Sequence, residues 1–156
     1  MKYLMGIDNG GTFSKAALFD EDGKQISVAS VPTVTITPKP GYTEGYDELW
    51  EVNAQAVRNA IEKSNIDPKD IAGVSFSGHG KGLYMVGYDG KPSYNGIIST
   101  DTRAWAQVKR WHEDGTDKKV YEKTLQDILA VQPVSILRGS KKICRKSLRE
   151  HSISLQ

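Results

Sequence analysis

Apolar and polar residues alternate along the first part of the chain, in runs that cover residues 2–8, 14–20 and 25–35. Alternation with a period of two is typical of strands that bury one face. A turn of sequence Asp-Glu-Asp-Gly joins the second run to the third. The pattern therefore predicts an antiparallel meander of three strands at the start of an α/β domain with a mixed sheet.

A helical period follows a loop rich in proline and glycine at residues 37–46. Asp47 is placed to cap a helix that runs to about Ser64. The apolar positions of this helix fall on one face: Leu49, Val52, Ala56, Val57, Ala60 and Ile61.

More strands are expected at residues 71–77, 82–88 and 96–99. Flanking helices are predicted from residue 100 or 101 to Trp111, from Lys118 to Leu129, and from Pro133 onward. Aromatic residues on helices usually belong to the core. We expect this of all three tryptophans: Trp50, Trp105 and Trp111.

The composition is that of one globular domain: 156 residues, 38% hydrophobic and 26% charged, with a net charge of +2. This charge gives no basis for a nucleic-acid or membrane partner. The single cysteine, Cys144, excludes an internal disulfide and suits a reducing compartment. No apolar stretch reaches membrane-spanning length and no signal-peptide pattern opens the chain, so a cytoplasmic location is expected.

The first candidate site is the break between the first two strands, Asp8-Asn9-Gly10-Gly11-Thr12. Asn-Gly between strands is a strong hairpin signal, because both residues tolerate a positive φ. Glycines after a strand also let main-chain amides approach a phosphate, and a carboxylate at the strand end can hold a hydrated Mg²⁺. The residues alone leave both readings open. Lys15, on the second strand, is expected to be solvated.

A second candidate is Ser77-Gly78-His79-Gly80-Lys81-Gly82, where an apolar strand ends. Ligands of open α/β sheets bind at strand ends, so His79 and Lys81 are placed to reach one. A solvated loop is the alternative. Asp101 and Arg103 stand at an expected helix start, where they either grip hydroxyls or anions or form a simple cap.

Together these motifs resemble the FGGY family of carbohydrate kinases, in its xylulose-kinase-like branch. The likeness runs over residues 2–138, through YLMGIDNGGTFSKAALFD, KPGYTEGYDELW, GVSFSGHGKGLYMV, GIISTDTRAWAQV and VQPVSILR. It implies a ribonuclease-H-like, actin-like ATPase fold in two domains. It also implies an ATP-dependent kinase for a ketose such as xylulose or L-xylulose, with ATP and Mg²⁺ as cofactors and a small sugar as partner.

The resemblance assigns roles to the candidate residues. Asp8 would position Mg²⁺ or the transferring phosphoryl group. The ATP phosphates would face Gly10, Gly11 and Thr12. The sugar would lie against His79, Gly80 and Lys81, with Asp101 and Arg103 beside it.

Two positions depart from the family pattern. His79 stands where the family often has glutamine, and Lys81 stands where xylulose kinases have histidine. A cation at the second position points to a substrate that carries a carboxylate, such as a keto-sugar acid.

The family's general base, an aspartate, and its adenine pocket belong to the second half of the fold, and the likeness ends before both. Sugar kinases also close two domains to exclude water. We therefore expect no kinase activity from this chain alone and no catalytic base within it. The alternatives are a non-catalytic sugar- or nucleotide-binding module of the same fold, and a fragment that forms a homodimer through exposed apolar surface.

Residues 139–156, GSKKICRKSLREHSISLQ, are basic and leave the family pattern, which continues Trp-Leu-Lys-Glu-Asn-x-Pro-Glu after Arg138. Within codon degeneracy, one nucleotide restored before codon 139 gives Trp-Leu-Lys-Glu-Asn-Met-Pro-Glu-Lys. The sequence thus predicts a family domain over residues 1–138 and a frameshifted, non-native tail. A true divergent tail is the alternative.

Overall fold

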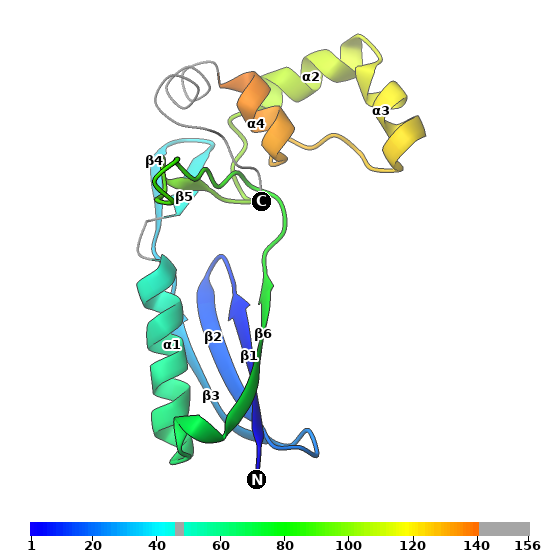
Figure 1. Ribbon diagram of the computed structural model, residues 1–156. Helices are drawn as coiled ribbons and strands as arrows, with labels where there is room; N and C mark the ends of the chain where they lie inside the picture. The colour runs from blue at the N-terminus through cyan, green and yellow to red at the C-terminus, as the bar shows by residue number, and fades with distance from the viewer. Residues whose placement is uncertain (46–48, 141–156) are drawn as a thin grey trace. The chain divides into compact units, whose positions relative to one another are not determined.

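A computed structural model describes residues 1–45 and 49–140 of the chain. These residues belong to two compact units, each with its own core (Figure 1). The first unit contains Met1–Thr35 and the helix and strand that end at His79. The second contains the hairpin from Ile36 and the chain from Gly80 onward.

The first unit is a four-stranded mixed sheet in the order β3-β2-β1-β6. Its antiparallel part is the meander of β1 (Tyr3–Asn9), β2 (Phe13–Phe19) and β3 (Gln25–Pro32), as predicted. The helix α1 (Leu49–Ser64) and a short 3₁₀ turn at Pro68–Asp70 lead to β6 (Ile71–Gly78), which pairs with β1 in parallel. The expected α/β fold with a mixed sheet is confirmed.

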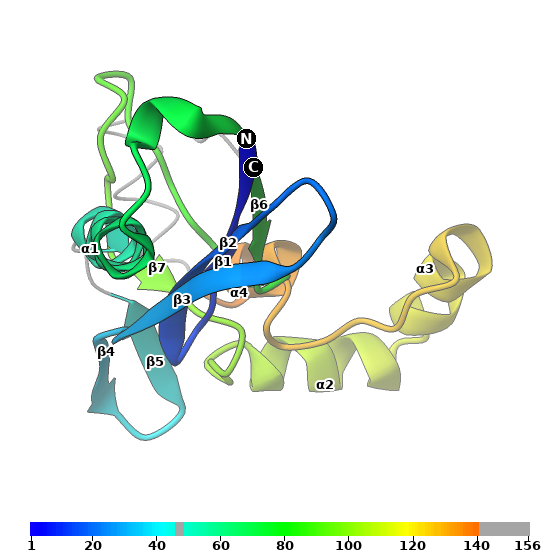
Figure 2. The same ribbon diagram turned by 90° about the horizontal axis from the view of Figure 1, so that it is seen from below.

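One face of the meander packs against α1, and Figure 2 shows this helix end-on beside the strands. Alternate residues of the meander point to that face, including Met5, Ile7 and Leu18. The helix meets them with two fully buried alanines, Ala56 and Ala60, whose small side chains let it lie close to the sheet. A hydrogen bond from Ser27 Oγ to the Ala60 carbonyl, 2.7 Å long, reinforces the contact.

The described part of the second unit has a small sheet and three helices. Its sheet has the order β4-β5-β7 and consists of β4 (Thr35–Lys39), β5 (Tyr42–Gly45) and β7 (Gly96–Ile97). The helices are α2 (Trp105–Glu113), α3 (Thr116–Thr124) and α4 (Pro133–Gly139). The core of this unit is aliphatic and is formed by Leu83, Met85, Ile97, Ala104 and Ile136.

Two sheet predictions in this unit are wrong. The expected loop at residues 37–46 contains the strands β4 and β5, and its tip at Gly41 accepts a hydrogen bond of 2.9 Å from the amide of Thr102. The expected strand at residues 82–88 forms no ladder. It makes isolated bridges to Ile97 and Pro92, and proline has no amide hydrogen with which to extend the pairing.

The helices differ from the prediction at their ends. α2 begins at Trp105, and α3 ends at Thr124 because Leu125 adopts a left-handed conformation with φ 54°. Trp50 and Trp105 are 78% and 63% exposed, so the core prediction is wrong for both. Among the described residues, no helix has the length and apolarity needed to cross a lipid bilayer. The Asp47 cap and residues 141–156 of the predicted tail lie outside the described residues.

Gly82 is the position in the second unit where substitution is expected to cost most. Its φ is +78°, and an added Cβ would lie 2.5 Å from the Ile97 carbonyl oxygen. We expect Gly82→Ala to lower the free energy of unfolding by about 3 kcal/mol, measured by chemical denaturation. Gly90→Ala is the matched control, because Gly90 has φ +75° and no atom within 4 Å of an added Cβ.

The control isolates the backbone strain, about 1 kcal/mol, from the steric clash. Equal losses for the two variants would contradict the close approach at Gly82.

Candidate functional site

The loop between β1 and β2 consists of Gly10, Gly11 and Thr12, because β1 continues through Asn9. The hairpin reading expected positive φ at Asn9 and Gly10, but neither is among the described residues with positive φ. Gly10 is required for a different reason: an added Cβ would lie 2.5 Å from the Phe13 carbonyl oxygen. Gly11 has no atom within 4 Å of such a Cβ, so it faces open space where a ligand can approach.

Thr33, just after β3, braces this loop. Its amide donates to the Thr12 carbonyl at 2.9 Å, and its Oγ1 donates to the Gly10 carbonyl at 3.1 Å. These two bonds tie both ends of the loop to the chain after β3, an arrangement that would lower the entropic cost of binding a ligand. Sequence reasoning missed Thr33, because its partners lie on a different hairpin.

Asp8 lies on the sheet face opposite α1 and is about half exposed. Its Oδ2 is 3.8 Å from Nζ of Lys15 on β2, so Lys15 belongs to this site although it was expected to be simply solvated. The two charges stand beside a shallow hollow of about 340 Å³. Small residues form much of its floor: Gly6, Ala17 and Ser75.

The donor set around Asp8 fits Mg²⁺ in one specific way. Within the described part of the chain, no cluster of three or more His, Cys, Asp or Glu could hold a metal ion. Mg²⁺ typically takes one or two carboxylates and completes its shell with waters and nucleotide phosphates. A single accessible carboxylate beside a glycine loop meets that requirement.

His79 follows β6 and lies at the same end of the sheet as the glycine loop. The register pairs Asn9 with Gly78, so strands 70 residues apart in sequence end together. The His79 amide donates to the Asn9 carbonyl at 3.3 Å, and ring Nδ1 lies 3.1 Å from the same oxygen. The first unit therefore brings Asp8, the loop and His79 to the same end of the sheet, while their roles in ligand binding stay a prediction.

Lys81 belongs to the second unit and has an unusual backbone. It is exposed and adopts φ +68°, a conformation that costs energy in any residue with a side chain. The next residue, Gly82, is fixed by a hydrogen bond of 2.8 Å from its amide to the Val131 carbonyl. Strain of this kind often marks a residue whose side chain is held for a ligand.

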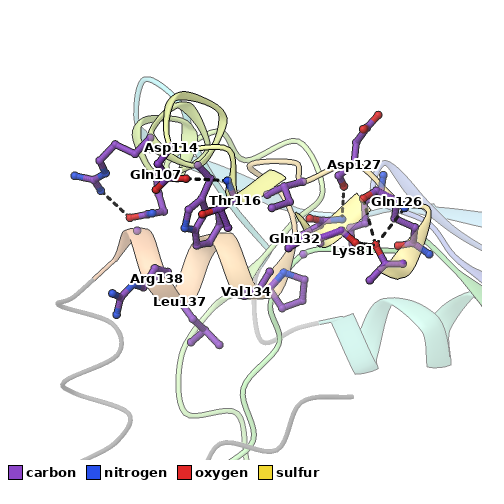
Figure 3. A pocket seen from close by; sticks show the side chains of 18 of the residues that line it. Lys81, Gln107, Asp114, Thr116, Gln126, Asp127, Gln132, Val134, Leu137 and Arg138 are labelled. Atoms are coloured by element: carbon purple, nitrogen blue, oxygen red, sulfur yellow. Dashed lines mark hydrogen bonds between the residues drawn. The ribbon is translucent and has the colours of Figure 1, made fainter. Parts of the chain in front are cut away.

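Lys81 lines a groove of about 1650 Å³ within the second unit (Figure 3). Two more cations line it, Arg110 and Arg138, with the carboxylates Asp114 and Asp127. Figure 3 shows Lys81 where the segment from Gln126 to Gln132 forms one end of the groove.

Two groups in the groove have shifted pKa values. Side-chain and backbone hydrogen bonds from Thr116 lower the pKa of Asp114, which therefore stays a carboxylate down to more acidic pH. Burial raises the pKa of Tyr84 to about 12, so its phenol stays neutral at physiological pH. The groove accordingly carries fixed charges of both signs.

Asp101 and Arg103 are closed off from solvent, with side chains 0% and 2% exposed. Arg103 Nε lies 2.9 Å from both carboxylate oxygens, and Nη2 lies 2.8 Å from Oδ2. The Asp101 carboxylate also accepts from the Arg103 amide at 2.8 Å, so it is engaged in a local turn and does not start α2. The pair holds this turn together, and its contact with a sugar stays a prediction.

Comparisons with known proteins identify the family of this domain. Residues 3–150 match the model of the FGGY family of carbohydrate kinases, N-terminal domain. A probable L-xylulose kinase from Pasteurella multocida is 43% identical over 90% of this chain and 29% of its own length. The L-xylulose/3-keto-L-gulonate kinase from Escherichia coli is 37% identical over 90% of this chain and 28% of its own length.

A ligand-bound xylulose kinase from Lactobacillus acidophilus has the same fold over 97% of this chain and 30% of its own, with a TM-score of 0.87 and 25% identity. This chain thus spans less than a third of the length of these relatives. The family model covers nearly the whole chain, including the glycine loop and the segment around His79. The chain belongs to the FGGY family of carbohydrate kinases and corresponds to their N-terminal domain.

Proposed function

We propose that this chain provides the phosphate- and sugar-facing N-terminal domain of an ATP-dependent ketose kinase, for a substrate such as xylulose or L-xylulose. The observation that carries the proposal is the meeting of Asp8, the braced glycine loop and His79 at one end of the first sheet. The 43% identity to a probable L-xylulose kinase supports the substrate class. A cytoplasmic location is part of the same proposal.

Phosphoryl transfer needs positioning, charge neutralisation and a base for the hydroxyl proton. Asp8 would hold Mg²⁺, which neutralises phosphate charge when it is bound. Gly10, Gly11 and Thr12 would approach the ATP phosphates, since Gly11 faces open space. His79 would receive a sugar hydroxyl. The sugar contacts that the resemblance assigns to Gly80, Lys81, Asp101 and Arg103 belong to the second unit, where the buried Asp101–Arg103 pair would act by holding the turn before α2.

The base is not among these residues. The resemblance assigns it and the adenine pocket to a part of the family fold outside the range that this chain matches. A chain that holds one side of the reaction contributes binding and charge but does not remove the hydroxyl proton or exclude water. We therefore propose that it is inactive by itself.

Titration calorimetry and a coupled assay for ADP test the proposal. We expect the purified chain to bind L-xylulose without turnover in the presence of Mg·ATP. His79→Ala should weaken sugar binding about tenfold, because it removes a hydrogen bond to the ligand. His112→Ala is the control, since His112 lies on α2 and pairs with Asp117 on α3, and neither residue is among those to which a ligand contact is assigned.

Turnover by the chain alone would overturn the proposed inactivity. Absence of binding to both L-xylulose and Mg·ATP would overturn the kinase-domain proposal and favour the self-associating alternative.

A specific observation supports that alternative. β6 is an edge strand without charged residues, and its Val74 and Phe76 are 50% and 76% exposed. Uncharged edges with apolar side chains pair readily with other strands. Two copies of β6 paired antiparallel about Ser75 would place Val74 opposite Phe76 in both directions. This would make a homodimer.

The finer substrate proposal concerns Lys81. A strained, exposed lysine at the end of a groove is suited to a ligand carboxylate. The Escherichia coli relative is named for a keto-sugar acid as well as for L-xylulose. We propose that a keto-sugar acid is a substrate of the kinase to which this domain belongs.

We expect the chain to bind 3-keto-L-gulonate more tightly than L-xylulose, measured by calorimetry. Lys81→Met should reduce this preference about fivefold, the magnitude of one solvent-accessible ion pair. Lys91→Met is the control and should leave the preference unchanged, because Lys91 is also exposed but does not line the groove. An equal affinity for acid and neutral sugar in the unmodified chain would refute this.

The frameshift proposal for residues 139–156 concerns the gene. The family match continues to residue 150, so part of this segment aligns with the family. We expect the genomic sequence to contain one nucleotide more before codon 139, and the frame to continue as Trp-Leu-Lys-Glu-Asn. A gene that encodes the present tail without such a nucleotide would establish a divergent tail.

A further inference from the structure

Three residues at one end of the first unit, Asn53, Asn9 and His79, are linked by hydrogen bonds that the proposed function does not use. Asn53 bonds to the side chain of Asn9, and His79 bonds to its backbone carbonyl. Nδ2 of Asn53, on α1, donates to Asn9 Oδ1 at 3.1 Å and to the Leu49 carbonyl at 2.7 Å. Both partners are acceptors, so they determine which end of the Asn53 amide carries the hydrogens. Asn9 is consequently held with its Oδ1 toward α1.

His79 reaches the same residue from β6. Its backbone amide and its ring Nδ1 both face the Asn9 carbonyl oxygen, at 3.3 Å and 3.1 Å. A carbonyl oxygen only accepts hydrogen bonds, so Nδ1 must carry the ring proton. In the neutral ring, Nε2 is then the acceptor nitrogen.

The position of the Asn9 carbonyl depends on how firmly the end of β1 is held. Asn9 is the last residue of the strand, paired with Ser14 on one side and Gly78 on the other. Strand ends open more readily than strand centres. The bond from Asn53 fastens this end to α1, a long helix packed on the meander.

Asn53 itself carries an energetic cost. Its Oδ1 is buried and, among the described residues, is one of the side-chain atoms without a hydrogen-bond partner. An apolar residue at this position would avoid that penalty. Packing alone therefore does not account for an asparagine here, whereas its bond to Asn9 does.

We propose that Asn53 is a positioning residue: through Asn9 it holds His79 in the Nδ1-protonated tautomer, so that Nε2 accepts a hydrogen bond from a ligand hydroxyl. The assignment of a sugar hydroxyl to His79 rests on the proposed function. A ring released from Asn9 exchanges between tautomers and presents an N–H to the ligand for part of the time. The match between the acceptor nitrogen Nε2 and the donor hydroxyl of the ligand is then lost.

Nitrogen-15 spectra of the histidine rings test this on the whole chain without ligand, at alkaline pH where the rings are neutral. We expect the His79 Nδ1 to resonate as a protonated nitrogen and Nε2 as an unprotonated one. Asn53→Leu, which keeps the branched shape and the number of side-chain heavy atoms, should abolish this single-tautomer signature. It should also speed hydrogen exchange at the His79 amide about fivefold, as expected for loss of one hydrogen bond.

Asn59→Leu is the matched control, because Asn59 lies on the same helix and bonds to Gln55 within it. It should leave the His79 spectrum unchanged. Asn9→Ala breaks the same link and keeps the backbone carbonyl, so it should reproduce the effect even if Asn53→Leu fails to fold. A His79 protonated on Nε2 in the unmodified chain overturns the proposal, and so does an unchanged signature in either variant.

The spectra are recorded without sugar, so their outcome is independent of the proposed function. A failed kinase-domain proposal would appear as absent ligand binding with the tautomer signature intact.

Discussion

The parallel pairing of β1 with β6 is the constraint on which the candidate site depends. It aligns Asn9 with Gly78 and so brings the glycine loop and His79 to one end of the sheet. Parallel neighbours need a long crossover, and α1 with its connections provides it. Among the described residues, α1 packs on one face of the meander. The hollow and the accessible carboxylate of Asp8 lie on the opposite face.

The charged residues of the second unit divide into two kinds. Asp101 and Arg103 form a buried bidentate pair, in which loss of one partner would leave the other charge uncompensated. Such a pair specifies the local turn before α2. Lys81 is the opposite case, because it is exposed and held in an unfavourable backbone conformation. Packing gives little reason for a lysine there, which is why we propose a ligand role for it.

Sequence patterns correctly predicted the strands and the helix whose formation depends mainly on local sequence. Alternation predicted the meander and β6, and helical spacing predicted α1 through Ser64. The errors lie where distant residues decide the structure. Gly41 meets Thr102, which is 61 residues away in sequence, and the ring of Tyr84 leaves no room for a side chain at Gly96. A local pattern does not span the distance from Gly41 to Thr102, and the sequence around Gly96 does not show that a tyrosine ring fills its side-chain space.

The same division holds for the candidate site. The glycine loop and His79 were predicted from short motifs, whereas Thr33 and Asn53 were missed. A signal for Asn53 was present, since it falls at helical spacing between Leu49 and Ala56 on the face that packs against the sheet. A polar residue in such a position indicates a specific partner.

Two alanines on the buried face of α1 set its distance from the sheet. Ala56 and Ala60 have no exposed surface, so a larger side chain at either position would push the helix outward. Asn53 lies one turn before Ala56 and would move with the helix. The spacing between α1 and the sheet, which apolar residues set, thereby decides whether the Asn53 amide stays within reach of Asn9. Repacking this hydrophobic layer is therefore a means of tuning the proposed ligand recognition without altering any residue at the site.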